Sequence, residues 1–384
     1  MEILMRKNYE VVVVGGGIGG ICAAVAAARG GVSVLLMEKL INLGGLATAG
    51  LISWYEPLCD GKGNQLIYGL AEEVIHICTK YSFDNLPEKW GGSCEKEQRN
   101  DRYSTMFSPT VASLALEEFV LNHGVDILFD VLAVEPVMEE NQCRGVFIEE
   151  IGGRKFVSCR VLIDGTGTAV MAQRAGIPTR TGKNYMTYIV HEFEREMGKK
   201  LQEGGGMHLF RRWMNSGSDM FGNGQPDKRQ EEECESAEDV TQFVEEGKRR
   251  MLKLCMEKER DNYDLLSLPW IPQIRTIRRI QGAVDFTAEN GKKYADTIGI
   301  CGDFRGKNIG NRYEIPFGAL FHPMFPNILV CGRIISAPQG DGWEVARVIP
   351  VCALTGEAAG KAAALVVKRN VGIERIRAEE IRVC

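Results

Sequence analysis

Glycines at positions 15, 17 and 20 have the types and the spacing to bind a diphosphate. They belong to the run Gly15-Gly16-Gly17-Ile18-Gly19-Gly20, which follows four consecutive valines. In such a pattern the first glycine permits a tight turn, the second lets the backbone approach a pyrophosphate, and the third lets a helix pack closely on its strand. The N–H groups and the dipole at the start of that helix then stabilise the phosphates. The spacing therefore predicts a dinucleotide site.

An acidic residue, Glu38, limits which dinucleotide can bind. It ends a second apolar run, residues 32–38, where a carboxylate can accept hydrogen bonds from the adenosine ribose hydroxyls. The same carboxylate would repel a 2′-phosphate. The pattern therefore favours FAD or NAD and disfavours NADP.

A strand–helix–strand unit is needed to bring these residues together. Residues 11–14 are too few for a core helix and suit a strand buried on both faces of a parallel sheet. Residues 18–29 are rich in alanine, which favours a helix and lets it lie close to the sheet. Residues 32–38 supply the second strand, so the sequence predicts a βαβ unit.

Three further glycine turns follow short apolar runs. The segment 44–48, Gly-Gly-Leu-Ala-Thr, stands where an NAD dehydrogenase usually continues into another helix, and its small residues would let the backbone lie flat against a large planar ligand. Residues 161–164 lead into Gly165-Thr166-Gly167, and residues 328–331 lead into Gly332. A small-residue helix expected at about 350–368 places another helix N-terminus near the cofactor. We expect these corners to converge on one elongated ligand.

Composition excludes several classes of function. The 384 residues carry 46 Lys+Arg and 51 Asp+Glu, a net charge of -5, and no basic stripe, so nucleic acid is not an expected partner. No apolar run approaches the roughly 18 residues of a membrane span, and residues 1–8 lack a secretion signal, so we expect a cytoplasmic protein. None of the 12 cysteines forms a C-x-x-C pair, so neither a redox dithiol nor a metal site is encoded locally.

The remaining pattern predicts how the chain is organised. We expect a strand and an antiparallel β-meander between 125 and 159, a strand at 185–194, a strand at 274–284, and helices at 69–80, 109–122 and 236–260. The sequence pattern changes at Gly176, and we therefore expect three segments. Residues 1–175 and 295–384 form the cofactor domain, and residues 176–294 form an inserted substrate or cap domain.

Taken together, several motifs resemble the FAD-dependent oxidoreductases of the glutathione-reductase-like superfamily, in the branch related to fumarate reductase and succinate dehydrogenase flavoprotein subunits. The motifs are Gly15–Gly20 with Glu38, Gly44–Thr48, Leu162–Gly167, Arg275–Ile280, Tyr313–Pro316, Asn327–Arg333 and Arg347–Pro350. The resemblance implies an α/β fold: a Rossmann-like FAD-binding domain with a β-meander and an inserted α+β substrate domain. No histidine precedes His76, so FAD should be noncovalent. The sequence has no second glycine fingerprint, so we do not expect a built-in NAD(P)H domain.

The resemblance also implies a set of residues that contact FAD. They are Gly15, Gly17, Ile18, Gly19, Gly20, Glu38, Lys39, Gly44, Gly45, Leu46, Ala47, Thr48, Val131, Leu132, Thr166, Gly167, Gly332, Arg333, Arg347 and Val348.

The expected reaction is hydride transfer between a small organic substrate and flavin N5. Arg275 and Arg278 are candidates for holding an anionic or carbonyl substrate, because arginine offers a bidentate fork that stays charged. His191 could act as a general acid or base. An amine, polyol or sugar-like substrate in place of an α,β-unsaturated acid, an electron-transfer or regulatory flavoprotein, and an NAD-dependent dehydrogenase stay open, as do the electron acceptor and the oligomeric state.

Overall fold

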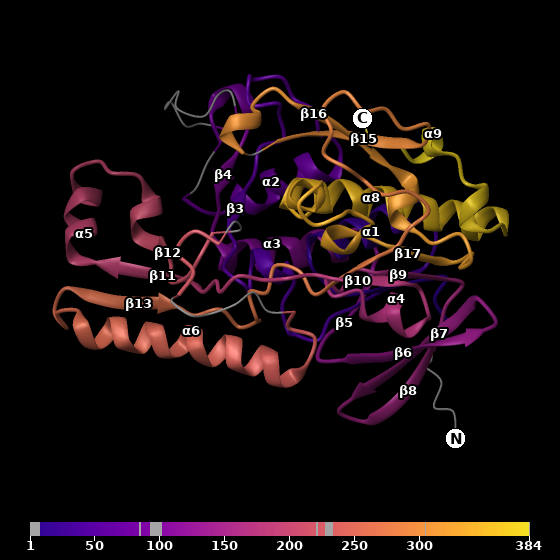
Figure 1. Cartoon of the computed structure of the whole chain (residues 1–384), viewed down its shortest axis with the longest axis horizontal. Helices are drawn as coiled ribbons and strands as arrows, with labels where there is room; N and C mark the ends of the chain where they lie inside the picture. The colour runs from indigo at the N-terminus through magenta and orange to yellow at the C-terminus, as the bar shows by residue number, and fades with distance from the viewer. Residues whose placement is uncertain are drawn as a thin grey trace.

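The computed structural model describes residues 8–83, 86–92, 102–219, 222–226, 233–303 and 305–383 (Figure 1). Of the 12 cysteines, Cys94 and Cys384 lie outside these residues. The ten others are free thiols, and eight of those are buried. Within the described residues no group of histidine, cysteine, aspartate and glutamate side chains could hold a metal ion.

A five-stranded parallel sheet forms the centre of the molecule, in the order β17–β9–β1–β2–β5. Its strands are β1 (Val11–Val14), β2 (Val34–Met37), β5 (Asp126–Leu128), β9 (Val161–Asp164) and β17 (Ile328–Val330). Val11 pairs with Val34 on one side and with Val161 on the other, so the valine strand is central and fully buried, as predicted. Because all five strands are parallel, the turns that follow their carboxyl ends meet at one edge of the sheet.

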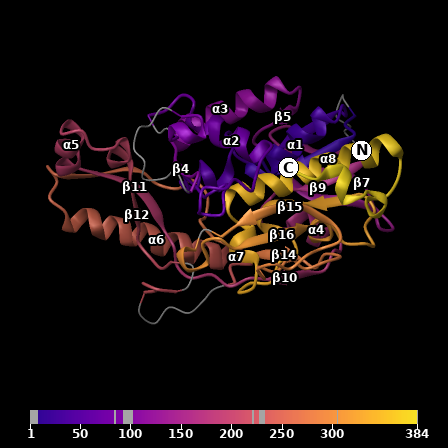
Figure 2. The ribbon, with the colours of Figure 1, turned by 90° about the horizontal axis from the view of Figure 1, so that it is seen from above.

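Two helices, α1 (Ile18–Arg29) and α8 (Ile349–Arg369), pack side by side (Figures 1 and 2). Glycines allow their close approach: a Cβ at Gly356 would lie 2.1 Å from the carbonyl oxygen of Gly19, and one at Gly360 would lie 2.2 Å from that of Ala23. The bounds predicted for α1 are confirmed, and those for α8 differ by one residue at each end. Two other helices of this part, α2 (Leu70–Thr79) and α3 (Pro109–Asn122), pack against each other.

Helix α8 differs from expectation in one respect. By length and composition alone it could cross a membrane, contrary to the prediction that no segment comes near this limit. Its most apolar 18-residue window is 78% buried inside the protein, as in the core helix of a globular domain. The alanines that raise its hydropathy serve its packing on α1.

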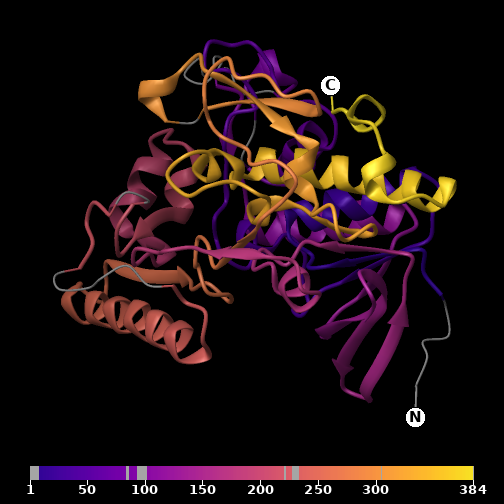
Figure 3. The same cartoon turned by 45° about the vertical axis from the view of Figure 1, so that its right-hand side comes forward.

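The predicted β-meander is present as an antiparallel sheet of β6 (Leu132–Glu139), β7 (Gln142–Glu150) and β8 (Gly153–Ser158). Figure 3 shows it beside the central sheet. The short helix α4 (Val170–Arg174) packs against β6.

A separate group of elements carries its own small core. It contains the sheet β12–β11–β13 and helices α5 (Arg195–Gln202) and α6 (Ala237–Glu257), which lie to one side of the central sheet in Figures 1 and 3. Its core consists of Met186, Tyr188, Val190, Cys234, Phe243, Met251 and Ile274. Its strands are β11 (Ile189–Glu194), β12 (Arg212–Asn215) and β13 (Tyr263–Ser267). The predicted start of α6 is confirmed, because Ser236 and Asp239 form a capping box.

The strand expected at 274–284 is shorter than predicted. Only β14 (Arg278–Ile280) is a strand, and it pairs antiparallel with β10 (Thr179–Thr181). The remaining elements are β3 (Trp54–Tyr55), β4 (Thr105–Met106), β15 (Thr297–Gly302), β16 (Arg312–Pro316), α7 (Trp343–Ala346) and α9 (Ala378–Ile381). The boundaries at 175 and 294 stay a prediction.

Candidate active site

The first glycine turn follows β1 and starts α1. Gly15 has φ +102°, and a Cβ there would lie 2.6 Å from the carbonyl oxygen of Gly165. A Cβ at Gly20 would lie 1.9 Å from the carbonyl oxygen of Gly15, so only glycine lets α1 approach the strand. In contrast, a Cβ at Gly17 would meet no atom within 4 Å. Gly17 is the N-cap of α1 and opens onto free space, which is where a phosphate would meet the helix N-terminus.

The second glycine turn lies directly against the first. Gly44 donates its backbone N–H to the carbonyl oxygen of Gly16 at 2.8 Å, and Gly17 and Gly44 form a parallel β-bridge. A Cβ at Gly45 would lie 3.0 Å from the Cα of Gly17. Residues Gly45–Ala47 then form a short 3-10 helix, and all three line the cavity.

The third turn, after β9, and the fourth, after β17, also contact the first turn. Gly165 donates to the carbonyl oxygen of Val14 at 2.8 Å, and a Cβ at Gly165 would lie 3.0 Å from the Cα of Gly20. A Cβ at Gly19 would lie 3.3 Å from the Cα of Gly332. Four corners that are far apart in the chain therefore surround one cavity of about 310 Å³.

Most of the residues predicted to contact a cofactor line this cavity. They are Gly15, Gly17, Ile18, Gly19, Glu38, Lys39, Gly44, Gly45, Leu46, Ala47, Thr166, Gly167, Gly332, Arg333 and Arg347.

Five others of the predicted set are not among the residues that line the cavity. Gly20 is buried between α1 and β1, and Val348 caps α8. Thr48 is buried and donates its hydroxyl to the carbonyl oxygen of Leu43 at 2.5 Å. Val131 donates its N–H to the carbonyl oxygen of Glu38 at 3.3 Å, and Leu132 is 56% exposed.

Glu38 lines the cavity and is held in place by backbone hydrogen bonds. Its side chain is buried, and its Oε2 accepts a 2.6 Å hydrogen bond from the backbone N–H of Gly16. Its Oε1 accepts one of 3.0 Å from the N–H of Leu40. Each oxygen keeps a second lone pair, so the carboxylate can still accept hydrogen bonds from a ribose.

Arg333 also lines the cavity, and its side chain contacts the segment that follows Gly176. One of its nitrogens, Nη1, donates to the backbone carbonyl oxygens of Ile274 and Arg275, the second at 2.9 Å. Burial, together with the nearby charge of Arg347, lowers the pKa of its guanidinium to about 10. Arg333 therefore stays charged at neutral pH.

The residues predicted to be catalytic lie outside the cavity lining. Arg275 donates from Nη2 to the carbonyl oxygen of Ser218 at 3.0 Å, and burial, with Arg347 nearby, lowers its pKa to about 10. Arg278 forms an ion pair with Glu235 at 2.7 Å.

His191 is 2% exposed, and its Nε2 has no hydrogen-bond partner among the described residues. Burial, together with the charge of Arg211, lowers its pKa to about 4. The roles predicted for these three residues stay predictions.

Several lining residues were not in the predicted set. One wall of the cavity is apolar and comes from the segment after Gly176; it consists of Val240, Ile271, Pro272, Ile274 and Ile277. No local pattern marks these side chains, because their placement depends on how α6 and the chain before β14 fold over the glycine turns. Leu40, Gly165, Thr168, Cys331, Ile349 and Cys352 also line the cavity, and each lies within four residues of a predicted one in the sequence.

The sheet, the glycine turns and the buried acid define a Rossmann-like dinucleotide-binding protein. The FAD dependent oxidoreductase family matches residues 10–190 and 190–384, so the chain belongs to that family and its cofactor is FAD. The residues fit this cofactor, because Gly17 leaves its helix N-terminus open to the cavity and Glu38 keeps free lone pairs.

The chain is also similar to curated relatives and to a solved structure. A digeranylgeranylglycerophospholipid reductase from Methanoculleus marisnigri is 23% identical over 206 residues, which are 50% of this chain and 48% of the relative. One from Methanospirillum hungatei is 25% identical over 221 residues, which are 54% and 53% of the two chains. This chain thus spans about half the length of these curated relatives.

The structure of p-nitrophenol 4-monooxygenase from Pseudomonas putida is similar with a TM-score of 0.51 at 12% identity, over 98% of this chain and 84% of that one. This similarity concerns the fold alone.

Proposed function

We propose that this FAD-dependent oxidoreductase binds FAD noncovalently in the glycine-lined cavity and transfers a hydride between a small organic substrate and flavin N5. The observation that carries the proposal is the contact between four separate glycine turns around one cavity, with Glu38 in its lining. The adenosine lies at Glu38 and the diphosphate at Gly17 and the N-terminus of α1. The flavin lies toward Gly45–Ala47 and Gly332.

When bound, FAD supplies the hydride chemistry at N5. The chain's own residues bind and orient the ligands. The apolar wall, which consists of Val240, Ile271, Pro272, Ile274 and Ile277, excludes water from the cavity. The absence of water strengthens the electrostatic interactions there. Residues 176–294, which carry that wall and a core of their own, serve as the substrate domain in this proposal.

A visible spectrum of the purified protein, followed by an anaerobic substrate screen, tests the proposal. We expect a yellow protein whose flavin is released into solution on denaturation and whose colour one substrate bleaches. Digeranylgeranylglycerophospholipid belongs in the screen beside small acids, amines and polyols, because the relatives' names specify that substrate and the cavity wall is apolar.

Other results would favour other functions. A flavin that stays attached after denaturation would contradict noncovalent binding. A yellow protein that no substrate reduces would favour an electron-transfer or regulatory role. A colourless protein that binds only NAD would overturn the proposal.

A further inference from the structure

Three consecutive backbone carbonyl groups, those of residues 49–51, accept hydrogen bonds from the segment that follows Gly176. The donors to residues 49, 50 and 51, in that order, are the backbone N–H of Trp270 at 2.8 Å, the Nε2 of Gln273 at 2.7 Å and the indole Nε1 of Trp213 at 2.6 Å. We call these three donors the clamp. The residues that carry them are not among those that line the cavity.

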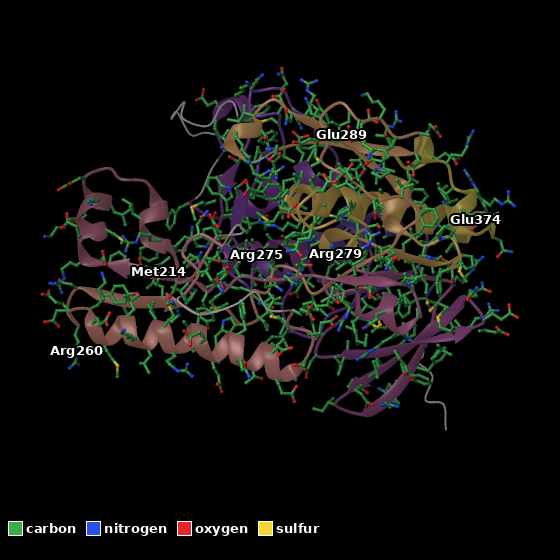
Figure 4. All side chains as sticks on the ribbon, in the orientation of Figure 1. Met214, Arg260, Arg275, Arg279, Glu289 and Glu374 are labelled. Carbon is green, nitrogen blue, oxygen red and sulfur yellow. The ribbon has the colours of Figure 1, made fainter. Side chains whose placement is uncertain are left out.

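Gln273 also ties residues 49–51 to the sheet β12–β11–β13. Its side chain is buried, and its Oε1 accepts a 2.6 Å hydrogen bond from the backbone N–H of Ile189. Its Nε2 donates a second bond, of 2.9 Å, to the carbonyl oxygen of the same residue. Ile189 begins β11, and Trp213 lies on β12, where Figure 4 labels the neighbouring Met214. Because β11 and β12 pair with each other, the loop is fastened to two paired strands.

Leu51 has a strained backbone at this contact. Its φ of +57° lies in the left-handed region, which residues other than glycine rarely adopt, and its side chain is buried. Such a conformation persists only where the surrounding structure determines it, and it is found mostly at functional sites. The bond from Trp213 to the carbonyl oxygen of Leu51 supplies one such constraint.

The clamp joins two parts of the cavity lining. Ile271, Pro272 and Ile274 belong to the apolar wall and are direct neighbours of Trp270 and Gln273 in the chain. On the other side of the contact, residues 49–51 follow the turn Gly45–Ala47, which also lines the cavity. The clamp therefore holds the apolar wall and the glycine turn in a fixed relative position.

We propose that Trp213 and Gln273 are positioning residues, whose bonds to the loop hold the apolar wall closed over the flavin. The proposal rests on the function proposed above, in which the flavin lies toward Gly45–Ala47. Since all three donors come from one connected unit, they should open together, as cooperative local units of a protein do. Opening of the clamp moves the wall and admits water and substrate to the flavin.

Hydrogen exchange and flavin spectra of single variants test the clamp. Trp213→Phe removes the indole N–H but keeps an aromatic ring, so one of the three bonds is lost. Exchange of the Trp270 amide in the holoprotein should then become roughly two- to tenfold faster, since one ordinary hydrogen bond shifts an opening equilibrium by about that factor. The visible circular dichroism of the bound flavin should change as well.

Gln273→Glu provides a second variant in case Trp213→Phe fails to fold. As a carboxylate, the new side chain keeps the acceptor for Ile189 but loses the donor to the loop, so exchange and spectrum should change in the same direction. Trp270→Phe is the matched control, because the Trp270 side chain is 81% exposed and only its backbone N–H belongs to the clamp. Both measurements should stay as in the wild type in this control.

A merely structural role predicts a different result. Trp213→Phe and Gln273→Glu would then lower the free energy of unfolding and leave the flavin spectrum of the folded holoprotein unchanged. If either the Trp270 amide or the flavin spectrum behaves as in the wild type in both variants, the clamp is wrong even though the protein binds FAD. A wild-type protein that binds no FAD would instead overturn the proposed function, and exchange of the Trp270 amide would still test the clamp.

Discussion

The backbone N–H of Gly44 donates a 2.8 Å hydrogen bond to the carbonyl oxygen of Gly16. This bond joins the turn after β2 to the turn after β1 and aligns two flat, side-chain-poor segments along one cavity. Since no side chain is needed for the bond, both turns can expose their backbone to a ligand. The contact brings two glycine turns together in the cavity lining, beside polar side chains such as Glu38.

Replacing Glu38 tests where the adenosine lies. Glu38→Ala should weaken FAD binding by about 1.5–3 kcal/mol, the range for hydrogen bonds to a charged group. Fluorescence titration of the deflavinated protein measures this loss. Glu374→Ala is the control, because Glu374 lies at the periphery in Figure 4 and pairs only loosely with Arg375, at 3.7 Å. Unchanged FAD retention in Glu38→Ala would contradict the placement of the ribose.

Two glycines in the same turn should respond to alanine in different ways. Gly20→Ala places a Cβ 1.9 Å from the carbonyl oxygen of Gly15, so α1 must shift, at a cost of about 1–3 kcal/mol in the free energy of unfolding. Gly17→Ala meets no protein atom, so its stability should change little while FAD affinity falls. Urea unfolding and FAD titration of both variants measure the two effects. Equal loss of stability in the two variants would contradict the packing described here.

The buried His191 should make stability depend on pH. Its pKa of about 4 in the folded protein lies below the ordinary value of 6.5, so the unfolded chain binds more protons between these values. The free energy of unfolding should therefore fall as the pH is lowered from 6.5 to 4. In His191→Asn, urea unfolding across this range should show a shallower decline than in the wild type. Parallel profiles would mean that His191 does not titrate abnormally.

The capping box of α6 should matter locally. Ser236→Ala removes the hydrogen bond from the N–H of Asp239 to the serine hydroxyl, which is 3.0 Å long. We expect a loss of about 1 kcal/mol, seen as faster amide hydrogen exchange in the first turns of α6. Thr241→Ala is a control within the same helix, because Thr241 lies beyond the cap and its hydroxyl donates to the carbonyl oxygen of Ala237. The same increase in exchange in both variants would argue against a specific cap effect.

The sequence by itself determined the elements whose signals are local. Four valines, a glycine turn and an alanine run predict β1 and α1 because periodicity and glycine content act within a few residues. The β-meander and the start of α6 were likewise predictable from alternation and from Ser236 with Asp239. Parallel strands also place their carboxyl-end turns on one edge, so the convergence of the glycine corners could be expected.

Only the tertiary structure decided which side chains face the cavity. Arg275 and Arg278 look alike in sequence, yet Arg278 pairs with Glu235 and Arg275 with the backbone of Ser218. Arg333, in contrast, lines the cavity. The apolar wall from Val240 to Ile277 depends on how a distant segment folds over the turns. Such placements result from long-range packing and the burial of charge. No periodic pattern in the sequence indicates either of them.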